Sequence, residues 1–154
     1  MSRWGEVEAQ APEFAARVQA VFDAHKHKTM ATLRRDGSPR ISGTEVQFVV
    51  GEVWLGSMDG AMKARDLLRD SRVAIHSGTV DLELQQGDAK IAGRATEVRD
   101  PALWRAVNGE ETSPDESHLF RIDVSEVVLT RVEGDELAIE SWTPARGLRL
   151  VRRR

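Results

Sequence analysis

The residues from 53 to 75 include a set of side chains that could bind a phosphate. A short apolar strand, 53–57, ends in the hydroxyl group of Ser57. Asp59-Gly60 then introduces an amphipathic helix, with Lys63 in its first turn. The free backbone amides at a helix start, the helix dipole, a serine hydroxyl and a lysine ammonium can converge on one anion. The spacing therefore predicts an anion site at Ser57 and Lys63.

Asp59 supports a second interpretation of the same segment. An aspartate just before a helix commonly caps its first amides, and Lys63 would then be an ordinary solvated helix residue. The two interpretations exclude each other, because a capping carboxylate would occupy amides that a phosphate needs and would repel it. The spacing alone leaves both open.

Other common catalytic motifs are absent from the sequence. It contains no nucleophile elbow, no Walker-type glycine loop, no dinucleotide-binding GxGxxG, no HExxH and no cysteine. The histidines are spread over a helix end, a strand and the end of a polar loop, so we expect no metal site. They are His25, His27, His76 and His118. We expect the four tryptophans to serve packing.

Short strands dominate the elements that must position Ser57 and Lys63. Helices are predicted over 12–24, 61–70 and 102–107, and strands over 28–35, 40–50, 53–57, 72–76, 80–84, 90–98, 119–132 and 136–142, before a last apolar segment, 148–151. Asp36-Gly37 forms the first hairpin turn, Gly51-Glu52 the next, and Asp100-Pro101 caps a helix. A polar loop covers 108–117. In strand 40–50 the alternation of inward- and outward-facing residues shifts by one position near Gly43, which predicts a bulge or bend there.

This pattern indicates one domain of the mainly β (α+β) class over residues 1–154. Many short strands joined by hairpin turns favour an antiparallel barrel with helical inserts. Strands 46–50 and 53–55 are apolar on both faces, and few helices are available to cover them. We therefore expect a homodimer, in which a second copy buries the remaining apolar surface.

Composition narrows the possible partners and the compartment. The 154 residues carry a net charge of −3 and include no apolar stretch of about 20 residues that would cross a bilayer. Glu6 and Glu8 stand where a signal peptide would be basic and then apolar. We expect no nucleic-acid partner, no membrane partner and a cytoplasmic location.

Five segments, taken in order, resemble a known family. They are 32–41 (TLRRDGSPRI), 54–57 (WLGS), 63–67 (KARDL), 70–73 (DSRV) and 142–144 (WTP). Their order and spacing are similar to those of the pyridoxamine 5'-phosphate oxidase-like superfamily of FMN-binding split-barrel proteins. The resemblance covers nearly the whole chain and is closest to small actinobacterial members of the flavin- or deazaflavin-dependent oxidoreductase type.

The resemblance implies a six-stranded antiparallel split β-barrel with an N-terminal helix and short inserted helices. It implies a homodimer that holds FMN, or alternatively the 8-hydroxy-5-deazaflavin coenzyme, in a groove at the subunit interface. The matching cofactor-binding residues are Ser57 and Lys63 at the phosphate, Ala31, Thr32 and Leu33 beside the ring, Ser42, Gly43 and Thr44 along its edge, and Arg40 as a further candidate. Relatives often carry a serine where this chain has Ala61, and a proline followed by an aromatic residue where it has Gly43 and Glu45.

Three functions remain open at this stage. The first is an oxidoreductase, in which the cofactor transfers a hydride to or from a small-molecule substrate. The protein then binds and orients the cofactor and excludes water. The second is a non-catalytic carrier of a flavin or haem-type ligand. The third is a structural dimer without a ligand, which Ala61 and Asp59 would suit. Pyridoxamine phosphate oxidation itself is not expected, because the sequence shows no second basic cluster for a substrate phosphate.

Overall fold

One nine-stranded sheet forms the body of the computed structural model, which describes residues 2–110 and 113–154. The helices are α1 (Trp4–Gln10), α2 (Pro12–Asp23), α3 (Met62–Arg69) and α4 (Pro101–Asn108), and the strands are β1 (Lys28–Leu33), β2 (Pro39–Thr44), β3 (Val46–Val49), β4 (Glu52–Met58), β5 (Arg72–His76), β6 (Asp88–Glu97), β7 (Ser117–Glu133), β8 (Glu136–Thr143) and β9 (Gly147–Arg153). Neighbouring strands follow the order β2-β1-β5-β6-β7-β4-β3, and every described pair is antiparallel. The mainly β class is confirmed.

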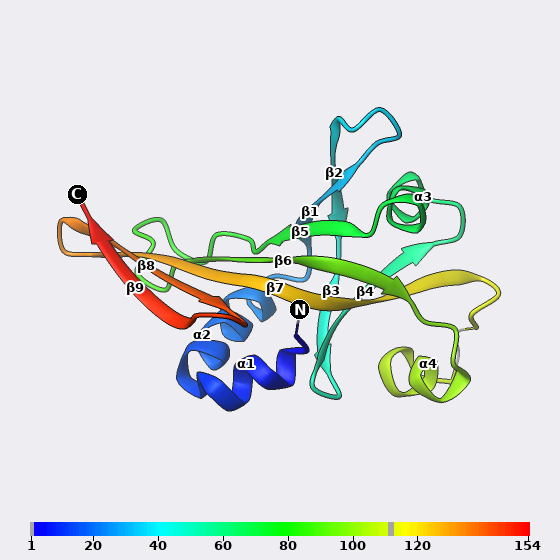
Figure 1. Cartoon of the computed structure of the whole chain (residues 1–154), viewed down its shortest axis with the longest axis horizontal. Helices are drawn as coiled ribbons and strands as arrows, with labels where there is room; N and C mark the ends of the chain where they lie inside the picture. Colours follow the sequence, from blue (N-terminus) through cyan, green and yellow to red (C-terminus); the bar gives the residue numbers. More distant parts are fainter. Residues whose placement is uncertain (1, 111–112) are drawn as a thin grey trace.

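The resemblance implies six strands, whereas the described residues form nine. Segment 40–50 contains two strands, β2 and β3, separated at Glu45. At the other end of the sheet β8 and β9 extend the ladder beyond β7, so the C-terminal hairpin projects to one side of the molecule (Figure 1). The added strands leave the class unchanged and lengthen the sheet.

The main core lies between the sheet and the two N-terminal helices, which lie side by side below β7 and β8 in Figure 1. Phe14, Val18 and Phe22 of α2 are fully buried, as the helix predicted over 12–24 requires. Helix α1, which the sequence analysis missed, adds Trp4 and Val7 to this core. All four tryptophans are buried, which confirms their predicted packing role.

The predicted bend at Gly43 is wrong. Gly43 pairs with Thr29 in the uninterrupted ladder between β1 and β2. Such a bend requires Ile41 on the inner face, whereas Ile41 is 74% exposed. Inward- and outward-facing residues therefore alternate without interruption along β2. The inner positions of β2 are the polar residues Arg40, Ser42 and Thr44.

Two other local predictions also fail. Residues 80–84 form a turn instead of a strand: Asp81 accepts hydrogen bonds from the backbone amides of Gln85 and Gln86, and Leu84 has a positive φ. The turn expected at Gly51-Glu52 lies one residue earlier, because Glu52 already begins β4. Within the predicted loop 108–117, residues 111–112 lie outside the described part of the chain.

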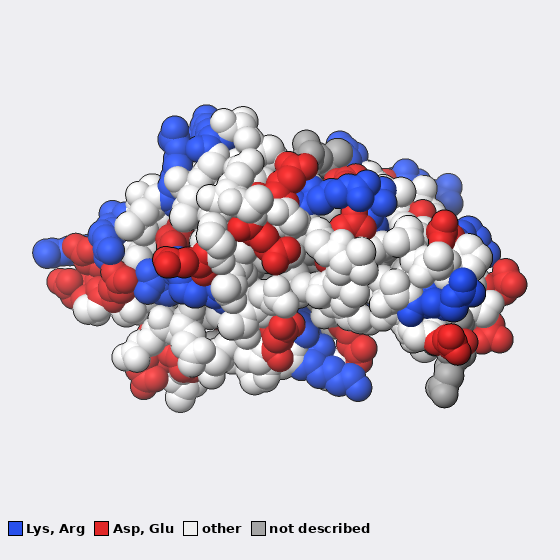
Figure 2. Space-filling view, turned by 90° about the horizontal axis from the view of Figure 1, so that it is seen from below, with Lys and Arg blue, Asp and Glu red and all other residues white. Residues whose placement is uncertain are grey.

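The surface carries charges of both signs. On the face drawn in Figure 2, basic and acidic side chains are interspersed among uncharged ones. No helix in the described ranges has both the length and the apolar character needed to cross a membrane. The outer face of β2, β1, β5 and β6 is less polar: cross-strand neighbours place Ile41, Ala31, Ala74 and Ala92 in one row.

Candidate functional site

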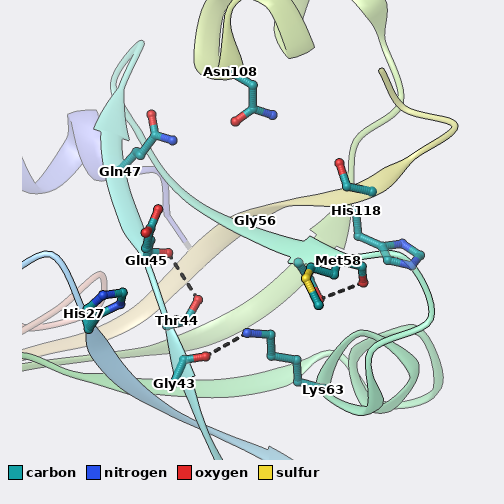
Figure 3. A pocket seen from close by; sticks show the side chains of 12 residues that line it. His27, Gly43, Thr44, Glu45, Gln47, Gly56, Met58, Lys63, Asn108 and His118 are labelled. Carbon is teal, nitrogen blue, oxygen red and sulfur yellow. Dashed lines mark hydrogen bonds between the residues drawn. The ribbon is translucent and has the colours of Figure 1, made fainter. Parts of the chain in front are cut away.

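A hollow of about 430 Å³ opens between the β2–β3 segment on one side and β4 with α3 on the other (Figure 3). Asn108, at the end of α4, lies above it in this view. The hollow is lined by His27, Gly43, Thr44, Glu45, Gln47, Gly56, Ser57, Met58, Lys63, Asn108, Ser117 and His118. Both residues of the predicted anion site, Ser57 and Lys63, therefore face the same cavity.

Lys63 crosses the cavity from the first turn of α3. Its Nζ donates a hydrogen bond of 2.7 Å to the backbone carbonyl of Gly43, which Figure 3 shows as a dashed line. Burial lowers the pKa of the Lys63 ammonium. In the described ranges no carboxylate lies within 4.0 Å of this nitrogen. Lys63 is thus a partly desolvated cation with a neutral partner, an arrangement that an anionic ligand would improve.

The start of α3 is open, which decides between the two interpretations of Asp59. Ala61 occupies the N-cap position, and no side chain caps the helix. The first helical hydrogen bond runs from the Arg65 amide to the Ala61 carbonyl, so the amides of residues 62–64 lack a partner within the helix. The capping interpretation of Asp59 is wrong, because its carboxylate lies 3.6 Å from Nε2 of His118 instead.

Ser57 lies near the end of β4, half-buried at the wall of the cavity. Its Oγ donates to the carbonyl of Met58 at 3.3 Å, a long hydrogen bond that a rotating hydroxyl group can exchange for another acceptor. Together, Ser57, Lys63 and the open amides of α3 form the donor set that suits a phosphate group.

His118 is a functional candidate that the sequence analysis did not assign to the site. Strand pairing places it directly opposite Ser57, with Nδ1 at 3.3 Å from Glu97 Oε1 and the ring stacked on Phe120. A carboxylate on one ring nitrogen orients the imidazole, whose other nitrogen, Nε2, accepts a 3.5 Å hydrogen bond from the Gly60 amide. The register of β4 on β7, which creates this contact, is not visible in the sequence.

Of the nine predicted cofactor residues, four line this cavity: Gly43, Thr44, Ser57 and Lys63. Ala31 and Leu33 line a separate apolar hollow of about 340 Å³ on the outer face of the sheet, and Thr32 also borders it. The hydroxyl group of Thr32 and the guanidinium of Arg40 both donate to Asp66 at 2.7 Å. Ser42 is half-buried on the inner side of β2. One copy of the chain thus brings the two phosphate residues together with Gly43 and Thr44 of the predicted ring edge, but not with Ala31, Thr32 and Leu33.

Asp66 explains why Arg40 is held away from this cavity. Asp66 is only 1% exposed, whereas Leu68 on the same helix is 55% exposed. Burial raises the pKa of Asp66, but hydrogen bonds from Arg40, Thr32 and Arg69 outweigh that effect and lower the pKa below its ordinary value. Asp66 therefore anchors α3 to β1 and β2 as a carboxylate.

Fold and site together define a class, the split-barrel proteins, here with an uncapped helix start beside a lysine where strand β4 leads into α3. The family model described as pyridoxamine 5'-phosphate oxidase matches residues 14–131. The chain belongs to this family. No curated protein sequence matches it significantly.

Solved structures of low sequence identity share the fold. PhzG from Burkholderia lata 383, in complex with tetrahydrophenazine-1-carboxylic acid, has a TM-score of 0.69 at 11% identity, over 97% of this chain and 92% of its own. A pyridoxamine 5'-phosphate oxidase-related, FMN-binding protein from Nostoc punctiforme has a TM-score of 0.64 at 12% identity, over 100% of this chain and 98% of its own. An F420 reductase has a TM-score of 0.53 at 17% identity, over 71% and 94%. These likenesses show the fold alone.

Proposed function

We propose that the chain binds FMN, or alternatively the 8-hydroxy-5-deazaflavin coenzyme, and acts as an oxidoreductase on a small molecule. The observation that carries this proposal is the open start of α3 beside Lys63, an ammonium without a carboxylate partner in the described residues. Both cofactors contain a phosphate group that this donor set fits. The FMN-binding relative supports the first cofactor and the F420 reductase supports the second.

The protein's part in the reaction follows from the lining of the cavity. A bound flavin or deazaflavin ring would supply the hydride chemistry. Lys63 would neutralise phosphate charge, and Ser57 and the amides of residues 62–64 would donate hydrogen bonds. His118, oriented by Glu97, would hold or release a proton at Nε2 beside the cavity.

A homodimer is part of this proposal. The row of Ile41, Ala31, Ala74 and Ala92 presents an exposed apolar surface, and hollows on the same face are lined mainly by apolar atoms. A second copy seated there would shield Ile41 from water and bring Ala31 and Leu33 into an interface. Ile41→Asp should produce monomers in sedimentation, whereas Leu82→Asp, at a residue 95% exposed in a turn, should leave the dimer intact. A wild-type monomer at about 50 μM, well above the dissociation constant of a stable dimer, would exclude this arrangement.

The experiment that tests the proposed function is a purification from a host that makes both cofactors, followed by an absorption spectrum. A flavin band or a deazaflavin band identifies the cofactor. Titration of the stripped protein with each cofactor then compares the wild type with Lys63→Ala. A haem-type spectrum would favour the carrier alternative. No bound chromophore and no binding in titration would favour the ligand-free structural dimer.

A further inference from the structure

A second hollow, of about 460 Å³, lies where the β1–β2 hairpin faces α3, and five arginines line it. They are Arg34 and Arg35 from the hairpin turn, Arg40 from β2, and Arg65 and Arg69 from α3. Lys63 is absent from this lining, and none of the five arginines lines the Lys63 cavity. The two hollows are therefore separate.

Two of the five arginines are held in place by Asp66. Arg40 Nε donates to Asp66 Oδ2 at 2.7 Å, and Arg69 Nη2 donates to Asp66 Oδ1 at 3.1 Å and to the Leu33 carbonyl at 2.6 Å. Each guanidinium has five N–H donors, so both keep further donors after these bonds are made. Arginines fixed in this way lose less conformational entropy when they bind a ligand.

The other three arginines form no close ion pair with the described residues. Arg34, Arg35 and Arg65 have no carboxylate within 4.0 Å in that part of the chain. The second aspartate of the hollow, Asp36, accepts hydrogen bonds from the backbone amide and the hydroxyl group of Ser38 within the hairpin turn. The hollow thus has five arginines against two aspartates in a chain whose net charge is −3. Such a concentration of like charge is relieved when an anion binds.

We propose that this hollow binds a small anion with at least two negative charges, carried by phosphate or carboxylate groups. The planar fork of arginine matches both groups, and several arginines around one hollow select for more than one charge. Met62 contributes an apolar wall. The proposal does not depend on the proposed function, because Ser57 and Lys63, which would hold the cofactor phosphate, do not line this hollow. Arg40, the further cofactor candidate, does line it and is bound by Asp66. It also corrects the expectation that the chain lacks a second basic cluster.

Calorimetric titration at low ionic strength tests this site, with pyrophosphate and citrate as probes. We expect the wild type to bind one or both, and the better probe shows whether phosphate or carboxylate is preferred. The double variant Arg35→Gln and Arg65→Gln should lose affinity by about tenfold or more. Arg65→Lys keeps the charge but loses the fork, so its loss should be smaller.

Controls keep the test specific. Arg146→Gln with Arg149→Gln removes the same charge from exposed positions on and next to β9 and should leave affinity unchanged. Lys63→Ala should also leave probe binding unchanged while it weakens FMN binding. Thermal unfolding of each variant checks that the fold is kept. No binding of either probe by the wild type would overturn the proposal, as would equal losses in both double variants or a loss of probe binding in Lys63→Ala.

Discussion

Helices α3 and α4 have the same length and each follows an aspartate, yet their first turns differ. Asp100 accepts hydrogen bonds from the amides of Ala102 and Leu103, at 2.8 and 3.1 Å, and caps α4 as the sequence predicts. Asp59 makes no such contact with α3. The amides of one helix are satisfied by the chain itself, and those of the other are left for a partner.

Spacing explains the difference. Asp100 is the N-cap residue of α4, and Pro101 follows it at the first helical position. Asp59 lies two residues before Ala61, the N-cap of α3, and Gly60, with a φ of 71°, stands between them. A side chain so far from the first turn cannot cap it. The start of α4 therefore serves stability, whereas the start of α3 is available for an anion.

The largest effect should come from Asp66, because it fixes the position of α3 on the sheet. Asp66→Ala leaves Arg40 and Arg69 without their shared carboxylate, and breaking a buried ion pair costs about 3 to 5 kcal/mol. Both arginines reach solvent, so we expect about 3 kcal/mol, the low end. Urea unfolding would measure it. Asp59→Ala, the matched control, should stay within about 0.5 kcal/mol, and similar losses in both variants would contradict the anchoring role of Asp66.

The same residue predicts a pH dependence. A carboxyl group whose pKa is lowered by folding stabilises the fold above its unfolded pKa of about 3.9, and this contribution is lost as the pH falls through the folded pKa. Wild-type stability should therefore fall more than that of Asp66→Asn between about pH 6 and about pH 3. Urea midpoints at the two pH values test this. Parallel decreases in the two proteins would show that Asp66 contributes nothing to acid sensitivity.

Lys63→Ala should have the next largest effect, on binding instead of on stability. Loss of a charge-assisted contact to the cofactor phosphate costs about 1.5 to 3 kcal/mol, which is about a ten- to hundredfold loss of affinity. The melting temperature should barely change, since alanine favours a helix. Titration with FMN and with the deazaflavin measures the loss. Arg105→Ala removes a charge from the last turn of α4 and should not affect binding, so equal losses would indicate a general charge effect.

Asp100→Ala should lower stability and leave cofactor binding unchanged, which is the opposite of the effect of Lys63→Ala. Removing the cap of α4 costs about 1 kcal/mol of stability, whereas Asp100→Asn should restore most of it because asparagine caps equally well. Cofactor affinity should stay unchanged in both variants. Thermal unfolding and FMN titration on the same preparations measure the two quantities, and weakened binding in Asp100→Ala would show that the two helix starts are not independent.

The sequence predicts what depends on neighbours along the chain. The spacing from Ser57 to Lys63, the Asp100 cap and helix α2 all follow from local patterns. The structure confirms the cap and the helix, and it places Ser57 and Lys63 at one cavity. Contacts between distant segments could not be predicted in this way. His118 reaches Ser57 only through the register of β4 on β7, and the arginines of the second hollow come from a hairpin and a helix about 25 residues apart.

The smallest predicted effect is that of Asp59→Asn, which tests the open helix start most directly. Its carboxylate is 75% exposed and therefore well screened, so removing the charge should tighten phosphate binding only about two- to threefold. Stability should not change, because Asp59 caps nothing and asparagine would cap as well in any case. FMN titration at low and high salt shows whether the tighter binding comes from the removed charge, since a charge effect on affinity fades as salt increases. A lower melting temperature in Asp59→Ala, which removes any cap, would show that Asp59 supports the first turn after all, and the contrast between α3 and α4 would then fail.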